Sequence, residues 1–347
     1  MAVDNFTLTL MGLAVALGRP GRGLPRRLAL VTAVIAANLP DVDLLVFLIR
    51  GQTEFVFRHA TVTHSVFALA VLPLGVGAIA WLFTRASFPR LAGLSLLCVA
   101  GHLGLDALGA WGIAPLAPIL DVRLGLGWLY STDFVLLGLF SLPLWAPRVA
   151  GVAQDRVATL AMALAACWVA VMGGLHALAE GRTRAAAAAA GLEPRDVEVF
   201  ASPFLPLFWN GLASDGEHLA QVRVTLAGAS EVGALHHVNM LHPAVQAALG
   251  TEVGARWMRW ARVPAAQVVC LTDPVGDAPG KVAVRLSDRR FADPWMESPA
   301  GTLRFELEYD RRGRPFRVLG HAWATAWTGT GDPEPGGCKD APTAARR

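Results

Sequence analysis

The chain has 347 residues, of which 54% are hydrophobic and only 16% are charged. Soluble domains carry about 25% charged residues, so this composition indicates a membrane protein. The 30 basic and 27 acidic side chains leave a net charge of +3, and the arginines are dispersed between apolar runs, which argues against a nucleic-acid partner.

Apolar segments follow one another through the first half of the chain. They cover residues 6–18, 28–49, 63–84, 91–110, 128–146 and 157–179. Most approach the roughly 20 residues that a helix needs to cross a membrane. The first is short and lacks a small-residue cleavage site, so we do not interpret it as a removable signal peptide. The expected fold is a polytopic α-helical membrane bundle of five or six helices.

Arginines in the connecting loops predict the orientation of this bundle, because short cytoplasmic loops are enriched in basic residues. The first, third and fifth loops hold eight arginines, whereas the alternate loops hold three. The first, third and fifth loops are therefore expected in the cytoplasm. The part of the chain after the last helix is then extracytoplasmic.

Polar residues interrupt the second apolar segment, in the order Asn38-Leu39-Pro40-Asp41-Val42-Asp43. Pro40 lacks the amide that a helix interior uses, so the helix should kink or break there. An extended stretch at the break would turn the carboxylates of Asp41 and Asp43 to the same side. The alternative is a loop in which Asp41 caps the next helix.

Two histidines lie near the start of the third segment. His59 precedes it and His64 opens it, with Thr61 or Thr63 expected as the helix N-cap. The positive end of the helix dipole disfavours a charged imidazole, which leaves the neutral form that binds metals. For either histidine alone, a hydrogen-bonded structural role is the alternative.

The fourth segment carries His102 and Asp106, four residues apart and therefore on one face of a helix. Such a pair can supply two metal ligands, or one ligand and its supporting carboxylate. A His to Asp hydrogen bond that joins helices is the alternative. Asp133, at the start of the fifth segment, is expected at the same membrane face.

The predicted orientation brings these polar residues to one membrane depth near the outer face. An intramembrane carboxylate costs about 2.5–3.5 kcal/mol even on the mildest scale, so a bound cation is the simplest compensation. The candidate metal ligands are Asp41, Asp43, His59, His64, His102 and Asp106. Nitrogen and oxygen ligands suit zinc, with manganese or iron as alternatives. A metal with an open position activates water, and a spare carboxylate takes its proton. The candidate catalytic residues are Asp43 and Asp133, of which Asp133 either orients a ligand or acts as the base.

The order of these motifs resembles that of the YdjM-like membrane-bound metal-dependent hydrolases of bacteria. The matching motifs, within about residues 5–140, are Pro40-Asp41-Val42-Asp43, His59 with Thr63-His64-Ser65, His102 to Asp106, Trp111-Gly112, and Asp133. The later stretch resembles the long form of the family in Ser202-Pro203 before Phe208-Trp209, in Trp260 to Pro264, and in Ser287 to Phe291. The resemblance implies a metal-dependent hydrolase in the bacterial inner membrane. In two departures from the family pattern, Leu8 stands where members often have histidine, and Ala60-Thr61 stand where they have Arg-Gly.

The expected site opens near the lipid interface, so the expected substrate is an ester or phosphoester of a lipid or lipid-linked molecule. An ion- or proton-coupled transporter is the first alternative, since it also places Asp and His within helices. It predicts inverted repeats, which we do not find in the sequence. The second alternative is a membrane-anchored scaffold with a degenerate metal site.

The chain changes character near residue 195. Short β-type runs, such as residues 221–226, 282–286 and 302–309, alternate with Gly, Pro and Asp clusters. The expected organisation is a helical membrane domain with the metal site over residues 1–182, a helical stalk or linker over 183–194, a β-rich extracytoplasmic domain over 195–330, and a disordered tail over 331–347. Within the β-rich part, His236, His237 and His242 are expected in a surface loop.

The four cysteines form no CxxC pair, so we do not expect sulfur ligands for a metal. Cys98 and Cys167 lie in apolar segments. Cys270 and Cys338 follow in the polar part, where they form either a disulfide, as an extracytoplasmic location would permit, or two free thiols.

Overall fold

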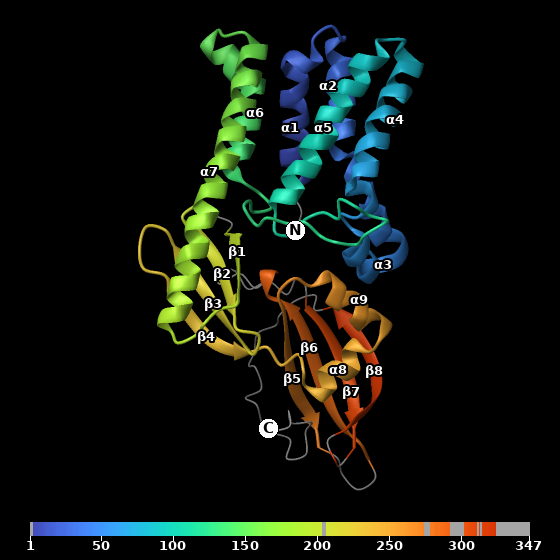
Figure 1. Cartoon of the computed structure of the whole chain (residues 1–347). Coiled ribbons are helices and arrows are strands. Elements are labelled where there is room, and N and C mark those ends of the chain that lie inside the picture. Colours follow the sequence, from blue (N-terminus) through green and yellow to red (C-terminus); the bar gives the residue numbers. More distant parts are fainter. Residues whose placement is uncertain are drawn as a thin grey trace. The chain divides into compact units, whose positions relative to one another are not determined.

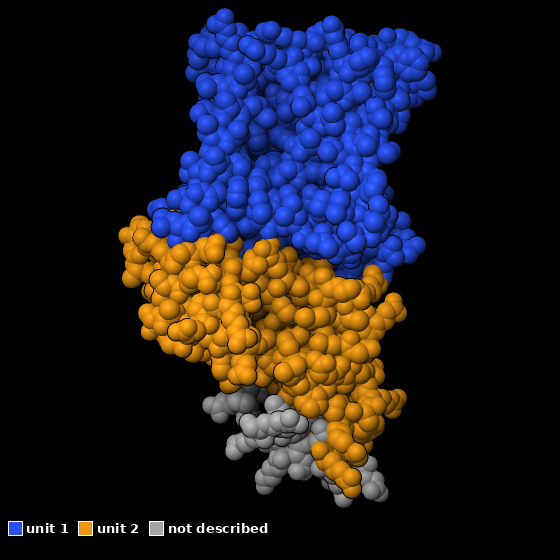
Figure 2. Space-filling model, in the orientation of Figure 1, with its two compact units in different colours: residues 1–178, 200–208 blue, residues 179–199, 209–347 orange. Residues whose placement is uncertain are grey.

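The structure is a computed structural model, and it describes residues 3–202, 206–273, 278–291, 302–310, 312 and 314–323. The predicted tail over residues 331–347, with Cys338, and Pro203 of the Ser202-Pro203 motif lie outside these residues. The chain forms two compact units (Figure 2). The first comprises Met1–Leu178 and Phe200–Phe208, and the second comprises Ala179–Val199 and Trp209–Arg347.

The first unit is built from helices (Figure 1). They are α1 (Asn5–Leu17), α2 (Arg26–Asn38), α3 (Leu45–Arg58), α4 (Val66–Thr84), α5 (Phe88–Leu108), α6 (Phe134–Ala150) and α7 (Gln154–Ala189), with the 3₁₀ turns η1 (Arg19–Gly21), η2 (Leu39–Leu44) and η3 (Val62–His64) between them. Among the described residues, four candidate membrane spans are long and apolar enough to cross a bilayer: Arg26–Arg58, Val66–Thr84, Phe88–Leu108 and Gln154–Ala189. The apolar helices α1 and α6 are shorter.

The long second apolar segment breaks where Pro40 predicts it. Residues 39–44 form the 3₁₀ turn η2 between α2 and α3, with Pro40 in its first turn. The break is therefore tight and not extended. Because a 3₁₀ helix has about three residues per turn, Asp41 and Asp43 point roughly 120° apart and meet different neighbours.

Small residues allow the helices around this break to pack closely. A Cβ on Gly12 of α1 would lie 2.9 Å from the carbonyl oxygen of Ala33 and from the Cβ of Ala37, both in α2. A Cβ on Gly77 of α4 would lie 2.9 Å from the Cα of Ala92 in α5. Contacts through small residues are typical of membrane helices, which pack in lipid by van der Waals fit. They bring α1 close to α2 and α4 close to α5.

The segment between α5 and α6 lies at the end of the first unit where α5 finishes (Figure 1). It contains two isolated β-bridges, between Gly109 and Leu129 and between Ile113 and Leu124. The amide of Ala114 donates to the carbonyl oxygen of Ala60 at 2.8 Å, which ties this segment to the residues before η3. The apolar run predicted from residue 128 therefore starts as loop and becomes helical only at residue 134.

Within the described residues, the strands form two four-stranded sheets, with strand orders β1-β2-β3-β4 and β5-β6-β7-β8, and most of their residues belong to the second unit. The strands are β1 (Asp196–Ala201), β2 (Phe208–Ser214), β3 (His218–Thr225), β4 (Glu231–His237), β5 (Pro264–Thr272), β6 (Gly280–Asp288), β7 (Thr302–Tyr309) and β8 (Pro315–Trp323), with α8 (Pro243–Leu249) and α9 (Glu252–Trp260) between the sheets in sequence. The predicted helical bundle with a C-terminal β-rich domain is confirmed. The predicted runs fall in β3, β6 and β7.

The cores of the two sheets form in different ways. In the second sheet, alternate residues of β7 are buried, as half-buried strands predict. In the first, Ala187 and Leu192 pack with Ala213 and Ala220. Residues of the predicted stalk at 183–194 thus contribute to the core of the second unit.

Two of the three histidines expected in a surface loop lie in a strand instead. His236 and His237 belong to β4, and the side chain of His242 caps α8 by accepting from the amide of Ala244 at 3.2 Å. For His236 and His237 the loop prediction is wrong, because the run Glu231–His237 pairs with β3, including His236 opposite Leu219; His242 lies in the connection before α8. Pairing to a neighbouring strand overrides the weak local signal of this polar run.

Candidate metal centre

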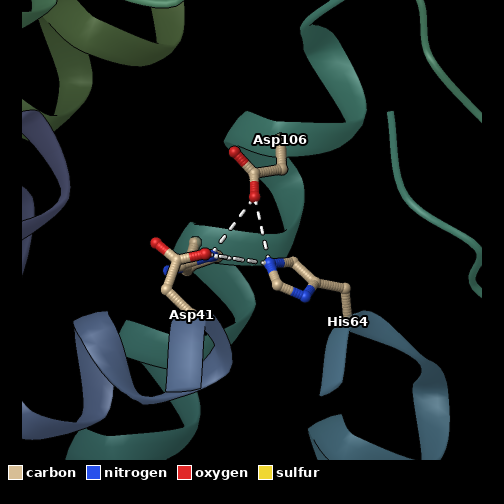
Figure 3. Close-up of side chains that lie close together, drawn as sticks. Asp41, His64 and Asp106 are labelled. Atoms are coloured by element: carbon tan, nitrogen blue, oxygen red, sulfur yellow. Dashed lines mark hydrogen bonds and ion pairs between the residues drawn. The ribbon is translucent and has the colours of Figure 1, made fainter. Parts of the chain in front are cut away.

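Four buried side chains meet at one end of the helical unit: Asp41, His64, His102 and Asp106. Asp41 comes from η2 and His64 from η3, whereas His102 and Asp106 lie in the last two turns of α5. None is more than 9% exposed. In Figure 3 the carboxylates of Asp41 and Asp106 and the imidazole of His64 point toward one another.

The distances between the facing atoms match those between the ligands of a metal ion. The Nε2 atoms of His64 and His102 lie 3.1 Å apart, and each is 3.2 Å from Oδ2 of Asp106. Oδ1 of Asp41 lies 3.5 Å and 3.6 Å from the same two nitrogens. In a tetrahedral site with bonds of about 2.0–2.1 Å, ligand atoms are about 3.3–3.4 Å apart.

Two of these atoms lack the hydrogen bonds that burial demands. Within the described residues, Oδ1 of Asp41 and Oδ2 of Asp106 are buried and accept no hydrogen bond. Nearly all buried carboxylate oxygens in proteins have a hydrogen-bond partner, because losing water without replacement is costly. The two oxygens are the ones that face the imidazoles.

The other ring nitrogens fix which atoms carry hydrogen. Nδ1 of His102 lies 2.6 Å from the carbonyl oxygen of Ala37, which can only accept. Nδ1 of His64 lies 3.0 Å from Oγ1 of Thr63, and that hydroxyl donates its own hydrogen to Oδ2 of Asp43 at 3.1 Å. Both imidazoles therefore donate through Nδ1 and, when neutral, present a lone pair at Nε2. A second ring nitrogen bound in this way is typical of metal-ligating histidines.

The alternative to a metal ion is a proton on His64, which would offset part of the negative charge of the two carboxylates. Burial lowers the pKa of the His64 imidazole, and the carboxylates of Asp106 and Asp41 raise it, to about 9 when no metal is bound. One proton leaves the pair of carboxylates with a net negative charge. A divalent cation neutralises both carboxylates and accepts all four electron pairs, so the residues present fit a metal ion better than they fit a proton.

A second group, Asp41, Asp43 and His59, also offers ligand atoms within 4.8 Å of one another. Hydrogen bonds already account for Asp43. Its Oδ1 accepts from Nδ1 of His59 at 3.0 Å, and its Oδ2 accepts from the amide of Ala60 at 3.0 Å and from Thr63. Asp43 needs no cation to balance its burial, unlike the four-residue centre.

His59 stands beside the centre with its ring held on both sides. It stacks on Phe55 at 4.8 Å between ring centroids and meets Trp111 edge-on at 5.6 Å. Because Nδ1 donates to Asp43, Nε2 carries the lone pair of the neutral ring. No described side chain donates to that nitrogen.

The structure does not bring Asp133 into either group. Its Oδ1 caps α6 by accepting from the amides of Val135 and Leu136 at 2.9 Å, and its Oδ2 accepts from the indole of Trp168 at 3.0 Å. Its place before a helix is explained by capping.

Sequence reasoning missed the part played by Thr63. Ser65, and not Thr61 or Thr63, is the N-cap of α4, accepting from the amide of Ala68 at 3.3 Å. Thr63 instead links Asp43 to His64. The adjacency of Thr63 to His64 was the available signal.

The two departures from the family pattern occupy buried positions. Leu8 and Ala60 are fully buried. Ala60 has a left-handed backbone, with φ of 57°, and its amide donates to Asp43. A guanidinium nevertheless lies nearby, because Arg123 donates to the carbonyl oxygen of His59 at 2.9 Å. The loop after α5 therefore supplies a cation that residues 60–61 do not.

The fold and the centre together define a helical membrane protein with a buried Asp/His cluster that could hold a metal ion. The family model described as YdjM inner membrane protein matches residues 3–178, which is half of the chain and includes the whole centre. The chain belongs to this family, and the β-rich domain extends beyond the match. Comparison with curated proteins and with solved structures gives no match.

Proposed function

We propose that this protein is a membrane-bound metal-dependent hydrolase, with zinc as the preferred ion and Asp41, His64, His102 and Asp106 as its ligands. The observation that carries the proposal is the convergence of four buried ligand atoms, of which the two carboxylate oxygens accept no hydrogen bond within the described residues. Zinc bound by these residues would lower the pKa of a water taken up as a fifth ligand and would polarise a substrate oxygen.

Asp43 and His59 act as the proton-handling pair. Asp43 holds Nδ1 of His59, which leaves Nε2 as the atom that takes a proton from the attacking water and returns it to the leaving group. Phe55 and Trp111 hold the ring against rotation. The catalytic role first expected for Asp43 is therefore exerted through His59, and Asp133 stays a helix cap.

The chain segments next to the centre favour a lipid substrate. In α3, which follows η2, Leu48 and Ile49 are 76% and 77% exposed. In the loop after α5, Ile119 and Val122 are 72% and 65% exposed. Both segments offer apolar surface to acyl chains, and Arg123 in the same loop offers a cation to an anionic head group. We propose an ester or phosphoester of a lipid or lipid-linked molecule as the substrate class.

The test uses the full chain, purified in detergent and loaded with zinc. It is incubated with a total lipid extract of bacterial membranes, and released polar products are followed by mass spectrometry. We expect products from the native protein and none from His102→Ala. Equal products from both proteins, or none from a preparation that carries stoichiometric zinc, would reject the hydrolase.

We further propose that the protein crosses the membrane several times, with the β-rich domain on the extracytoplasmic side. The arginine distribution supports this orientation. Cys270 in β5 also supports it, because it is disulfide-bonded and disulfides persist in oxidising compartments.

This orientation predicts the redox state of the cysteines in cells. Cys98 and Cys167 are free, whereas Cys270 is disulfide-bonded. When thiols are alkylated in denaturant after acid quenching, we expect Cys98 and Cys167 to react at once and Cys270 only after reduction. Alkylation of Cys270 without reduction would contradict the extracytoplasmic placement.

A further inference from the structure

We infer that the N-terminal segment Val3–Asn5 is a clamp that sets the direction of both carboxylates of the metal centre. This inference rests on the metal site of the proposed function, and it assigns positioning roles to Val3 and Asn5. Neither residue touches the point where the four donor atoms meet; each acts through a carboxylate.

The first arm of the clamp is a backbone amide. The N–H of Val3 donates to Oδ1 of Asp106 at 2.8 Å, in a buried contact between residues 103 positions apart. The other oxygen, Oδ2, is the one that faces His64 and His102. Fixing one oxygen of a planar carboxylate fixes the direction of the other.

The second arm is a side-chain amide. Nδ2 of Asn5 donates to Oδ2 of Asp41 at 2.6 Å, and it also lies 3.3 Å from Oδ1 of Asn38. Oδ1 of Asp41 is then left to face the two imidazoles. In each carboxylate, therefore, one oxygen accepts a hydrogen bond from the N-terminal segment and the other oxygen faces the imidazoles.

The residue between the two arms is anchored on both sides. The amide of Asp4 donates to the carbonyl oxygen of Ser131 at 3.0 Å. Its carboxylate caps α1, accepting from the amides of Phe6 and Thr7 and from the hydroxyl of Thr7. Val3 itself is only 5% exposed. The arms therefore extend from a fixed point at the start of α1.

The clamp predicts an effect on coordination as well as on affinity. A carboxylate released from its hydrogen bond can rotate and offer both oxygens to the ion, which raises the coordination number. Partners that orient metal ligands typically change metal affinity by about 10–100-fold when removed. A merely structural role would lower stability and leave the geometry of the bound metal unchanged.

The test is cobalt(II) binding to the purified full chain, read from the visible absorption that reports coordination number. Val3→Pro removes the amide hydrogen that Asp106 accepts, and Val3→Ala keeps it. Asn5→Ala removes the second donor, and Asn5→Gln keeps an amide there. Phe6→Ala, at an exposed neighbouring position, is the matched control.

We expect Val3→Pro and Asn5→Ala to raise the cobalt dissociation constant by about 10–100-fold and to weaken the visible band. Val3→Ala and Phe6→Ala should match the native protein, and Asn5→Gln should recover part of the loss. Variants are compared only when they elute like the native protein in size-exclusion chromatography. If Val3→Pro does not fold, Asn5→Ala decides the matter alone.

The experiment distinguishes failure of the metal site from failure of the clamp. If the native protein binds no cobalt, the metal site of the proposed function fails. If it binds cobalt and Asn5→Ala has the same affinity and spectrum, the clamp alone is wrong.

Discussion

Asp106→Asn should empty the metal centre and reduce hydrolysis by about 10³-fold. Oδ2 of Asp106 lies 3.2 Å from both imidazole Nε2 atoms, so an amide at this position removes a charge from the middle of the ligand set. A metal ion contributes several kcal/mol to the transition state, and each 1.36 kcal/mol is worth about tenfold in rate. Metal content by mass spectrometry and the initial rate on the lipid extract measure the two effects.

Asp133→Asn is the matched control, since the same chemical change is made outside the centre. Asn caps a helix about as well as Asp does, so α6 should keep its N-terminus. The variant should bind a native amount of metal and retain activity. Full metal in Asp106→Asn, or lost metal in Asp133→Asn, would contradict this assignment of ligands.

Asp43→Asn should keep the metal and lower kcat by about 10²–10⁴-fold, the usual contribution of a general base. Asp43 fixes Nδ1 of His59 as the donor, and an amide cannot hold the ring in the same way. Substrate binding does not use this pair, so KM should change little. Metal content, kcat and KM of the purified variant are measured together.

When two residues act together in one catalytic step, the losses of rate from their single substitutions do not add in the double variant. The double variant with Asp43→Asn and His59→Ala should therefore be no slower than the worse single variant. If Asp43→Asn loses its metal as Asp106→Asn does, Asp43 is a ligand and the proton-handling pair is wrong.

Local rules explain what could be predicted of the fold. Pro40 predicts the break between α2 and α3 because proline removes a helix hydrogen bond at a known position. The i, i+4 spacing predicts that His102 and Asp106 share a face. The alternation in residues 302–309 predicts β7, because half-buried strands alternate.

Local rules could not tell which of the candidate residues face the metal centre and which have another role. They put Asp41 and Asp43 on one side, because an extended break was expected, whereas the 3₁₀ turn sends them to different partners. Asp133 shows the same limit, because a carboxylate before a helix can be a cap or a ligand. Only tertiary contacts separate these roles: Asp133 accepts from the indole of Trp168 and belongs to neither group of ligand atoms.

Contacts between residues far apart in the chain could not be predicted from the sequence. The hydrogen bond from Val3 to Asp106 uses a backbone amide, so no side-chain type signals it. Arg123 donates to the carbonyl oxygen of His59 across a separation of 64 residues. Motif spacing identifies the donor atoms of a site, whereas their orientation depends on such distant partners.

X-ray absorption spectroscopy at the metal edge of the purified, zinc-loaded protein tests the central claim most directly. The account predicts one zinc per chain, bound by two imidazole nitrogens and two carboxylate oxygens at about 2.0–2.1 Å. In Asp106→Asn this pattern should disappear. A native protein that holds no zinc, or zinc whose shell contains no imidazole, would contradict the metal centre.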